Sequence, residues 1–359
     1  MAILFSDNRI SEMPDMTTQP TLFFETENNN APVGLQAGYF QSHDGFQLRY
    51  AICPPLKKQP ENTHIGTSNP QPSRGTVILL HGRNEAFEKY YETISDLNRR
   101  GFCVATMDWR GQGGSCRILK DAQRGYVRSF DDYQNDFEIF LKSIVLPDCP
   151  PDFYILAHST GALIALRSHQ MLQSRIRRMV LISPFLGLAR SIFHDKQLRP
   201  LASILSRLGL GSRYASKVPH QLAPESFGHN PLSHDQSRYI RNAAIISAQP
   251  QLGIAGPTFQ WLAQTLKAIY SINTPQFFDS FSIPTLIMVA GADRVVDGKA
   301  AIHFAQSLRS ASLITIDGAY HELLQESDFY REQVWAGFDA FIPGSAPVEQ
   351  LTEPKYTEL

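Results

Sequence analysis

Short apolar runs of strand length alternate with amphipathic segments of helix length from about residue 76 to residue 341. The strand candidates are apolar through their length, as expected of strands covered on both faces. This alternation predicts a mostly parallel sheet with crossover helices on both sides. The predicted strands are residues 76–80, 103–107, 153–157, 179–182, 285–290 and 312–316. The predicted helices, which carry apolar residues at three-to-four spacing, are residues 88–100, 130–145, 160–173, 298–308 and 329–341.

One interval breaks this alternation. About a hundred residues separate the strand that ends near Ile182 from the strand that starts near Thr285, far more than a crossover helix needs. The interval contains helical patterns, many leucines and isoleucines, and breaks at Pro200 and Pro219. We therefore expect a helical cap, residues 186–283, inserted into a core made of residues 37–185 and 284–342.

Polar segments flank the predicted core. Residues 1–36 are rich in Thr, Asn and Pro, which predicts a loosely held arm. The segments at 39–42 and 47–52 flank a turn and predict an opening β-hairpin. A polar, proline-containing stretch at 56–74 predicts a long surface loop, and residues 343–359 are predicted to be a C-terminal tail.

Composition excludes several classes of protein. The 359 residues are 43% hydrophobic and 19% charged, which is typical of a soluble globular protein. The 33 Lys and Arg are balanced by 34 Asp and Glu, so a nucleic acid partner is not expected. The four cysteines, Cys53, Cys103, Cys116 and Cys149, lack metal-ligand spacing and predict free thiols. We expect a cytoplasmic location, with peripheral membrane contact left open, because neither a signal peptide nor a spanning segment is evident.

A serine lies where a predicted strand turns into a predicted helix. The strand at 153–157 runs into His158, Ser159, Thr160 and Gly161 and then into an apolar helix. Small residues two positions before and after such a serine allow a strained turn to pack while the hydroxyl projects from the sheet edge. Ala157 stands where this motif usually has glycine. Taken alone, the pattern is explained equally well by an ordinary strand-to-helix turn.

The residues that a nucleophilic serine needs follow in the chain order Ser, Asp, His. A neutral imidazole must accept the serine proton, and a carboxylate must stabilise the imidazolium. His321 follows the last predicted strand, and Asp293 follows the strand after the insertion. Two other acids compete with Asp293. Asp297 is predicted to cap the helix at 298–308, and Asp317 lies only four residues before His321.

Two backbone N–H groups are candidates for stabilising an oxyanion. One belongs to Thr160, directly after the serine, and the other to Arg83, which follows the buried strand at 76–80 and a His-Gly turn. The alternative for the second is a plain strand-to-helix turn. A further glycine-rich turn starts at Asp108 and lacks the lysine of a nucleotide-binding loop, so we interpret Asp108 and Arg110 as residues that pin neighbouring turns.

Together these motifs resemble those of the α/β-hydrolases, in the group that contains monoacylglycerol lipases and bacterial lysophospholipases. The segment from Asn230 to Asp235 also resembles a cap segment of the lysophospholipase branch. The resemblance implies an α/β-hydrolase fold and hydrolysis of one acyl ester through an acyl-enzyme, without metal or cofactor. The matching pieces are the His81-Gly82 turn with Glu85, the turn from Asp108 to Gly113, Ser159, Asp293, and His321 with Glu322-Leu323-Leu324.

We therefore predict a serine hydrolase that acts on a lysophospholipid or a monoacylglycerol. Ser159 attacks the ester, His321 transfers the proton, Asp293 orients His321, and the N–H groups of Thr160 and Arg83 form the oxyanion hole. The alternatives are a general carboxylesterase, a thioesterase or an aminopeptidase on the same fold, or a non-catalytic ligand-binding relative.

The first part of the insertion is locally basic. Residues 186–217 contain Arg190, Lys196, Arg199, Arg207, Arg213 and Lys217 but only one acid, Asp195. In one interpretation, these residues and the interleaved leucines form a basic amphipathic surface that contacts an anionic bilayer or a lysophospholipid phosphate. In the other, the apolar residues cover the sheet and the basic residues face solvent, as in most amphipathic helices.

Overall fold

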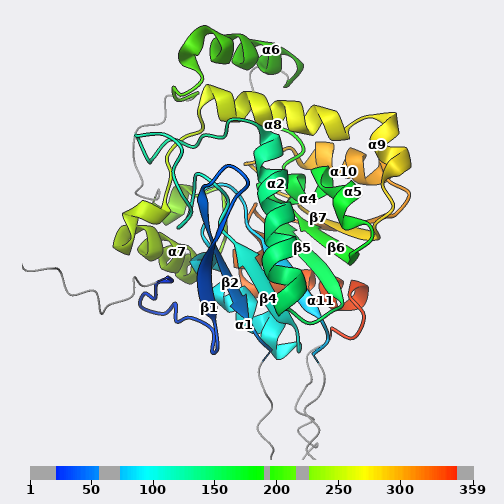
Figure 1. The fold of residues 1–359 in the computed structure, drawn as a ribbon. Helices are drawn as coiled ribbons and strands as arrows, with labels where there is room; N and C mark the ends of the chain where they lie inside the picture. The colour runs from blue at the N-terminus through cyan, green and yellow to red at the C-terminus, as the bar shows by residue number, and fades with distance from the viewer. Residues whose placement is uncertain (1–21, 56–72, 190–194, 216–225, 346–359) are drawn as a thin grey trace, which may run out of the picture.

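The computed structural model describes residues 22–55, 73–189, 195–215 and 226–345 (Figure 1). Its centre is an eight-stranded sheet in the order β1-β2-β4-β3-β5-β6-β7-β8. The pairs β1–β2 and β2–β4 are antiparallel and the others are parallel. The strands are β1 (Gln36–Gln41), β2 (Gln47–Cys53), β3 (Thr76–Leu80), β4 (Cys103–Met107), β5 (Phe153–His158), β6 (Ile176–Ile182), β7 (Thr285–Ala290) and β8 (Ala311–Ile316).

Helices cover both faces of the sheet. On one face Ile78 and Leu80 of β3 pack in the same cluster as Leu163, whereas Val77 and Leu79 point to the other face and pack with Phe338. Alternate residues of one strand thus serve two cores, as the two-residue period of a strand requires. The core helices are α1 (Tyr91–Arg99), α2 (Phe130–Phe140), α3 (Leu146–Asp148), α4 (Thr160–Arg167), α5 (His169–Leu172), α10 (Gly298–Ser307) and α11 (Asp328–Phe341).

The predicted strands are all present, and the predicted parallel arrangement is confirmed. β6 begins at Ile176, earlier than predicted. The helix predicted at 160–173 is divided at Ser168 into α4 and α5, and the one predicted at 130–145 continues beyond α2 as the π-helical turn Leu141–Val145. A 3-10 turn, Phe87–Tyr90, precedes α1.

The segment before β1 packs against the core, so the prediction of a loose arm is wrong for residues 22–35. Asn29 is buried and its amide donates to the carbonyl oxygen of Glu88, while the Tyr91 hydroxyl donates to the carbonyl oxygen of Phe24. Leu35 joins the core cluster beneath α1. These contacts hold the segment against the core despite its polar composition. The rest of the predicted arm (1–21), most of the loop at 56–74 and most of the tail lie outside the described residues.

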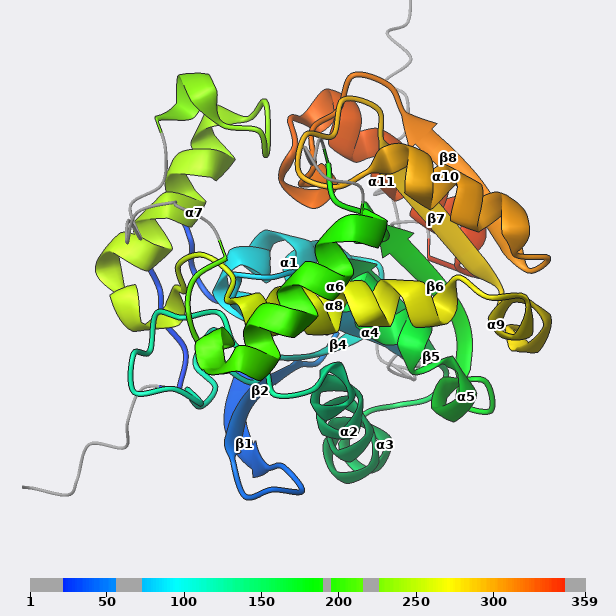
Figure 2. The same ribbon diagram turned by 90° about the horizontal axis from the view of Figure 1, so that it is seen from above.

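Between β6 and β7 lies the insertion, residues 186–283, and its described part is helical. It contains α6 (Asp195–Leu205), α7 (Gln236–Ala248), α8 (Phe259–Ile272) and α9 (Pro275–Ser280). Viewed from above, α8 crosses over the sheet and α6 lies across α8 on its outer side, whereas α7 stands apart (Figure 2). The predicted break at Pro200 is wrong, because Pro200 lies inside α6, a helix that packs across α8. Pro219 lies outside the described residues.

Charged side chains are buried where β2, β4 and the start of α1 meet. Arg49 donates to both carboxylate oxygens of Glu88, at 2.7 and 2.8 Å, and to Asp108. None of the three side chains is more than 1% exposed. Burial alone would raise the pKa of Asp108, but the Arg49 charge holds it at about 2. Asp108 also accepts from the N–H groups of Phe87 and Gly114, so it pins neighbouring turns as predicted.

Arg110 pins the same region from the other side of the turn. Its guanidinium binds Asp136 of α2 and Asp44 of the β1–β2 hairpin. The predicted structural role of this glycine-rich turn is therefore confirmed.

All four cysteines are free thiols, as predicted. Within the described part of the chain, no helix is long and apolar enough to cross a membrane.

We predict that Arg49→Leu lowers the free energy of unfolding by about 3–5 kcal/mol, because it leaves the Glu88 and Asp108 carboxylates buried without their cation. Urea denaturation followed by circular dichroism measures the change. Arg177→Gln is the matched control, since Arg177 forms an exposed pair with Asp152 and its loss should cost less than about 1 kcal/mol. Equal losses in the two variants would contradict the prediction.

Candidate active site

Ser159 occupies a sharp turn between β5 and α4. Its backbone has φ 51° and ψ −114°, a conformation that L-residues rarely adopt. The turn is held by hydrogen bonds from the Ser159 N–H to Ile182 and from the Phe185 N–H to the Ser159 carbonyl oxygen. Because β5 is flanked by β3 and β6, this conformation places Ser159 at the carboxyl edge of the sheet. Ala157, the departure from the usual motif, is fully buried in the core.

Gly161 is needed for steric reasons. A Cβ atom at this position would lie 2.5 Å from the carbonyl oxygen of Leu80 and 2.6 Å from that of His81. Real Cβ atoms do not approach backbone oxygens so closely, so only glycine lets the first turn of α4 pack against the end of β3. As a result α4, which begins with Thr160, is in direct contact with the end of β3, which precedes Arg83.

The structure brings the three predicted catalytic side chains together. Ser159 Oγ lies 3.2 Å from His321 Nε2, and His321 Nδ1 lies 2.7 Å from Asp293 Oδ2. All come from loops at the carboxyl ends of β5, β7 and β8, the edge where parallel sheets of this type bind ligands. The serine, the histidine and the acid therefore form one hydrogen-bonded chain.

Asp293 is held as an ionised acceptor. Its Oδ1 accepts the N–H groups of Val295 and Val296 at 2.8 and 3.0 Å. Burial would raise the pKa of Asp293, but the hydrogen bond from His321 and these N–H groups hold it below its usual value. The competing acids lie elsewhere: Asp297 caps α10 through the N–H groups of Lys299 and Ala300, as predicted, and Asp317 is exposed.

The two predicted oxyanion donors flank the serine. Thr160 is the first residue of α4, where N–H groups have no acceptor within the helix. A Cβ atom on Gly82 would lie 3.2 Å from Ser159 Cβ, so the backbone leading into Arg83 passes directly beside the serine. Glu85 accepts the N–H of Gly82 and fixes this loop.

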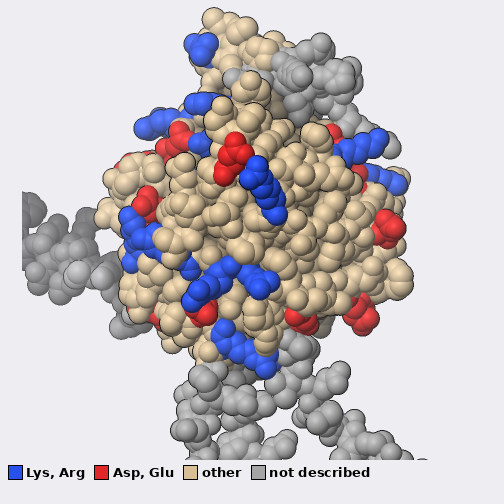
Figure 3. All heavy atoms as spheres, turned by 90° about the vertical axis from the view of Figure 1, so that its right-hand side faces the viewer, with Lys and Arg blue, Asp and Glu red and all other residues tan. Residues whose placement is uncertain are grey.

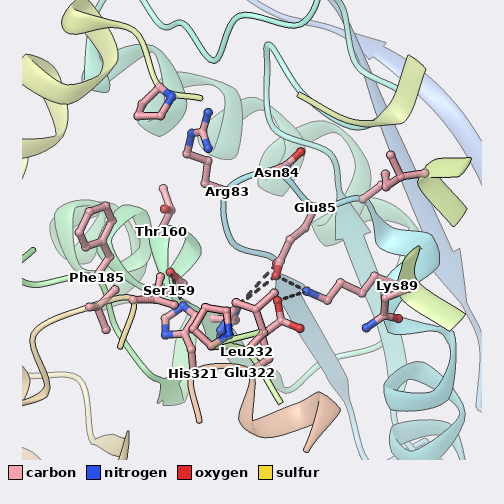
Figure 4. A pocket seen from close by; sticks show the side chains of 18 of the residues that line it. Arg83, Asn84, Glu85, Lys89, Ser159, Thr160, Phe185, Leu232, His321 and Glu322 are labelled. Atoms are coloured by element: carbon pink, nitrogen blue, oxygen red, sulfur yellow. Dashed lines mark hydrogen bonds and ion pairs between the residues drawn. The ribbon is translucent and has the colours of Figure 1, made fainter. Parts of the chain in front are cut away.

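A cavity of about 510 Å³ opens above Ser159, and most of its wall is apolar (Figure 4). Core loops form its floor, and the insertion forms its sides and roof through α7 and α8. Its apolar wall is made by Ala86, Phe185, Leu188, Pro231, Leu232, Ala243, Ile245, Ile246, Pro257, Trp261, Leu262, Val295 and Val296. The site is therefore a largely apolar pocket with Ser159 on its floor, the usual form of a small-molecule site.

Comparison with known proteins agrees with this geometry. Residues 71–328 match the model of the family described as serine aminopeptidase, S33. The chain is 32% identical over 271 residues to lysophospholipase L2 of Escherichia coli, which covers 71% of this chain and 76% of that protein. The chain belongs to this hydrolase family. Its predicted α/β-hydrolase fold is confirmed.

More distant relatives share the fold. Human monoglyceride lipase is 24% identical over 292 residues, 76% of this chain and 86% of that protein. The solved structure of a soluble variant of the Saccharomyces cerevisiae monoglyceride lipase, in complex with a substrate analog, superposes with a TM-score of 0.65 at 17% identity, covering 87% of this chain and 97% of that one.

The sequence analysis missed a polar cluster at one side of the hydrolase's cavity. Lys89 Nζ lies 2.7 Å from Glu85 Oε1 and 2.6 Å from Glu322 Oε1 (Figure 4). Burial would lower the pKa of Lys89, but the two carboxylates raise it, so the lysine is held as a cation. Glu85 also accepts from the Tyr90 hydroxyl, and its carboxylate lies beside His158. The four-residue spacing of Glu85 and Lys89 was the available sequence signal.

The segment from Asn230 to Asp235 fastens the insertion to the loop that carries His321. The Glu322 N–H donates to the carbonyl oxygen of Leu232, and Ser233 Oγ donates to that of Gln325. Glu326, which is fully buried, lies 2.8 Å from His234 Nδ1 and accepts the N–H of Tyr320. The motif singled out in the sequence thus connects the insertion to the catalytic loop.

We predict that Gly161→Ala lowers the free energy of unfolding by about 1–3 kcal/mol, because the added methyl group forces α4 away from β3. Urea denaturation measures the loss, and ester hydrolysis should fall with it because Ser159 moves with α4. Gly228→Ala is the control: nothing lies within 4 Å of a Cβ atom there, so its unfolding free energy should change by less than about 0.5 kcal/mol. A Gly161→Ala protein as stable as the wild type would refute this steric argument.

Proposed function

We propose that the protein hydrolyses the acyl ester of a lysophospholipid or a monoacylglycerol through an acyl-enzyme. The observation that carries this proposal is the hydrogen-bonded chain from Ser159 through His321 to Asp293 on the floor of an apolar cavity. The names of the relatives agree with it, since they are lysophospholipases and monoglyceride lipases. The presence of Ser159, His321 and Asp293 together also argues against a relative that only binds a ligand, because such a protein does not need all three residues.

In this mechanism Ser159 Oγ attacks the acyl carbonyl carbon while its proton passes to His321 Nε2. The oxygen of the tetrahedral intermediate lies between the N–H groups of Thr160 and Arg83. Asp293 holds the imidazole by its Nδ1 and stabilises the imidazolium. His321 then gives the proton to the leaving alcohol as the carbonyl re-forms. A water molecule releases the acyl group by the same route and restores the serine.

The cavity suits an amphiphilic ester. Each methylene of an acyl chain that leaves water contributes roughly 0.8 kcal/mol, and the apolar wall can receive such a chain. The helices of the insertion supply much of this wall, and we therefore assign residues 186–283 the role of a cap that holds the acyl chain. The polar groups of the lining, among them Asn84, would face the glycerol part of the substrate.

An aminopeptidase is disfavoured, although the matching family is described by that activity. Such an enzyme must bind a substrate ammonium, which needs an unpaired carboxylate in the pocket. Among the described residues that line the cavity, the acids are Glu85 and Glu322, and Lys89 bridges both. The described residues that the insertion contributes to the lining include no acid.

We predict that Ser159→Ala and Asp293→Asn each lower kcat for a monoacylglycerol by about 10⁴-fold or more. The first removes the nucleophile, and the second removes the charge that stabilises the imidazolium. Asp297→Asn is the matched control, because that acid caps α10 and asparagine caps about as well, so kcat should be unchanged and stability should change by less than about 0.5 kcal/mol. Labelling of Ser159 by a fluorophosphonate probe in the wild type is the direct test, and an unlabelled serine would refute the mechanism.

A panel of substrates tests the chemical class. Lysophospholipids and monoacylglycerols with matched acyl chains should be hydrolysed faster than short p-nitrophenyl esters, acyl thioesters or aminoacyl amides, because the cavity buries a long chain. Faster hydrolysis of the thioester or the amide would replace the proposed function with one of the alternatives.

We further propose that the cap contacts a lipid surface. Leu201, Ile204 and Leu208, at helical three-and-four spacing, are 47%, 52% and 71% exposed on the outer side of the cap. Arg207 and Arg213 are exposed beside them. Viewed from the side, acidic and basic side chains are spread over the molecule (Figure 3). The part that projects at the top of this view has a mostly neutral described surface. This arrangement favours apolar insertion, assisted by a few charges.

The other basic residues between residues 186 and 217 do not support the proposed lipid contact. Arg190 and Lys217, and the side chains of Lys196 and Arg199, lie outside the described part of the structure. A location at the inner face of the membrane therefore stays a prediction.

We predict that Leu208→Asp weakens binding to vesicles by at least about tenfold, because the leucine side chain no longer leaves water. Sedimentation with vesicles measures the binding. Phe329→Asp is the matched control, since Phe329 is 72% exposed on α11, a helix of the core and not of the cap. A similar loss in both variants would contradict insertion through the cap, and equal binding to neutral and anionic vesicles would remove the electrostatic contribution.

A further inference from the structure

Two basic side chains other than histidine line the cavity, Arg83 and Lys89, and they differ in their partners. Lys89 is bridged by Glu85 and Glu322. Arg83 has no carboxylate within ion-pair distance among the residues that the structure describes. Among the described residues, the pocket therefore contains one cation that is paired with carboxylates and one that has no carboxylate partner.

The contacts that hold the Arg83 side chain are neutral. One Nη atom donates to the carbonyl oxygen of Ala255, and the guanidinium carbon lies 5.1 Å from the centre of the Trp261 ring. Its buried Nε has no hydrogen-bond partner. Burial lowers the pKa of Arg83 to about 10, only partly offset by Tyr133 and Tyr214, so the group stays charged at neutral pH. A desolvated cation without a counter-charge is costly, and an anion would relieve that cost.

The position of Arg83 on the chain suggests where that anion would lie. Its backbone follows Gly82 beside Ser159, and its side chain extends along a different side of the pocket from Lys89 (Figure 4). About six covalent bonds separate the backbone nitrogen of an arginine from its guanidinium carbon. About six also separate the ester carbonyl carbon of a lysophospholipid from its phosphorus. One residue can therefore reach both the oxyanion and the phosphate.

We infer that the guanidinium of Arg83 binds the phosphate of a lysophospholipid head group, and that this contact selects lysophospholipids over monoacylglycerols. The inference rests on the proposed function, which leaves both substrates open. Guanidinium is suited to phosphate because its planar N–H groups match the phosphate oxygens. A monoacylglycerol carries a hydroxyl group at the corresponding position and leaves the arginine without a counter-charge.

The test compares kcat/KM for a lysophospholipid and a monoacylglycerol with the same acyl chain. Arg83→Gln keeps the backbone N–H but removes the charge, so the lysophospholipid should lose about 10- to 100-fold more than the monoacylglycerol. Arg83→Lys should restore part of the selectivity. An equal loss on both substrates, or no selective loss, overturns the inference, because the side chain would then act only through the loop.

Arg128→Gln is the matched control. Arg128 is exposed and lies outside the cavity lining, so its loss removes a positive charge from the surface without changing the pocket. The ratio of the two activities should be unchanged in this variant. A shift as large as that of Arg83→Gln would show a general effect of surface charge and overturn the specific contact.

Binding without chemistry gives a second readout. An ether analogue of the lysophospholipid should inhibit the wild type more strongly than the matched alkylglycerol, and Arg83→Gln should abolish this difference. An undiminished difference in the variant overturns the inference. A wild type that hydrolyses neither ester refutes the proposed function itself, whereas an active wild type with unshifted selectivity refutes only the role of Arg83.

Discussion

The strained turn at Ser159 is the constraint on which the site depends. β5 must leave the sheet and become α4 within one residue, and this is possible only because Gly161 lets the helix touch the end of β3. The same close packing places the backbone of Gly82 beside the serine. Strain at one residue thereby positions the nucleophile and both candidate oxyanion donors together.

Buried charge is organised differently in the core and in the pocket. Arg49 in the core and Lys89 at the pocket wall are each shared by two carboxylates, which offsets the cost of removing them from water. Such pairs hold turns together and leave little charge for a ligand. Arg83 has a cation-π contact and a carbonyl oxygen instead. Arg83 is thus the cation of the pocket that has no carboxylate partner among the described residues, which makes it the strongest candidate for recognising a substrate anion.

The parts of the fold that could be predicted are those governed by local pattern. The parallel strands are continuous apolar runs because both of their faces are covered, and the structure has a strand at every predicted run. Errors arose where the local pattern is overridden. Pro200 lies inside α6, and Asn29 in the polar segment before β1 is buried against the core. The contact of Asn29 with Glu88 has no signature in the local sequence, because the two residues lie 59 positions apart along the chain.

Chain order and residue type were sufficient to predict the reaction, because a serine in a strand-to-helix turn is followed by Asp293 and then by His321. The sequence was also sufficient to rank Asp293 above Asp297 and Asp317. Only the tertiary structure decided the surroundings of that chemistry. It brings Glu322 from the end of the chain to Lys89 near its beginning, and it places Arg83 against Trp261 and the carbonyl oxygen of Ala255, with no carboxylate partner among the described residues. Ion pairing depends on distances across the fold, and a sequence pattern carries no information about distances between residues far apart along the chain.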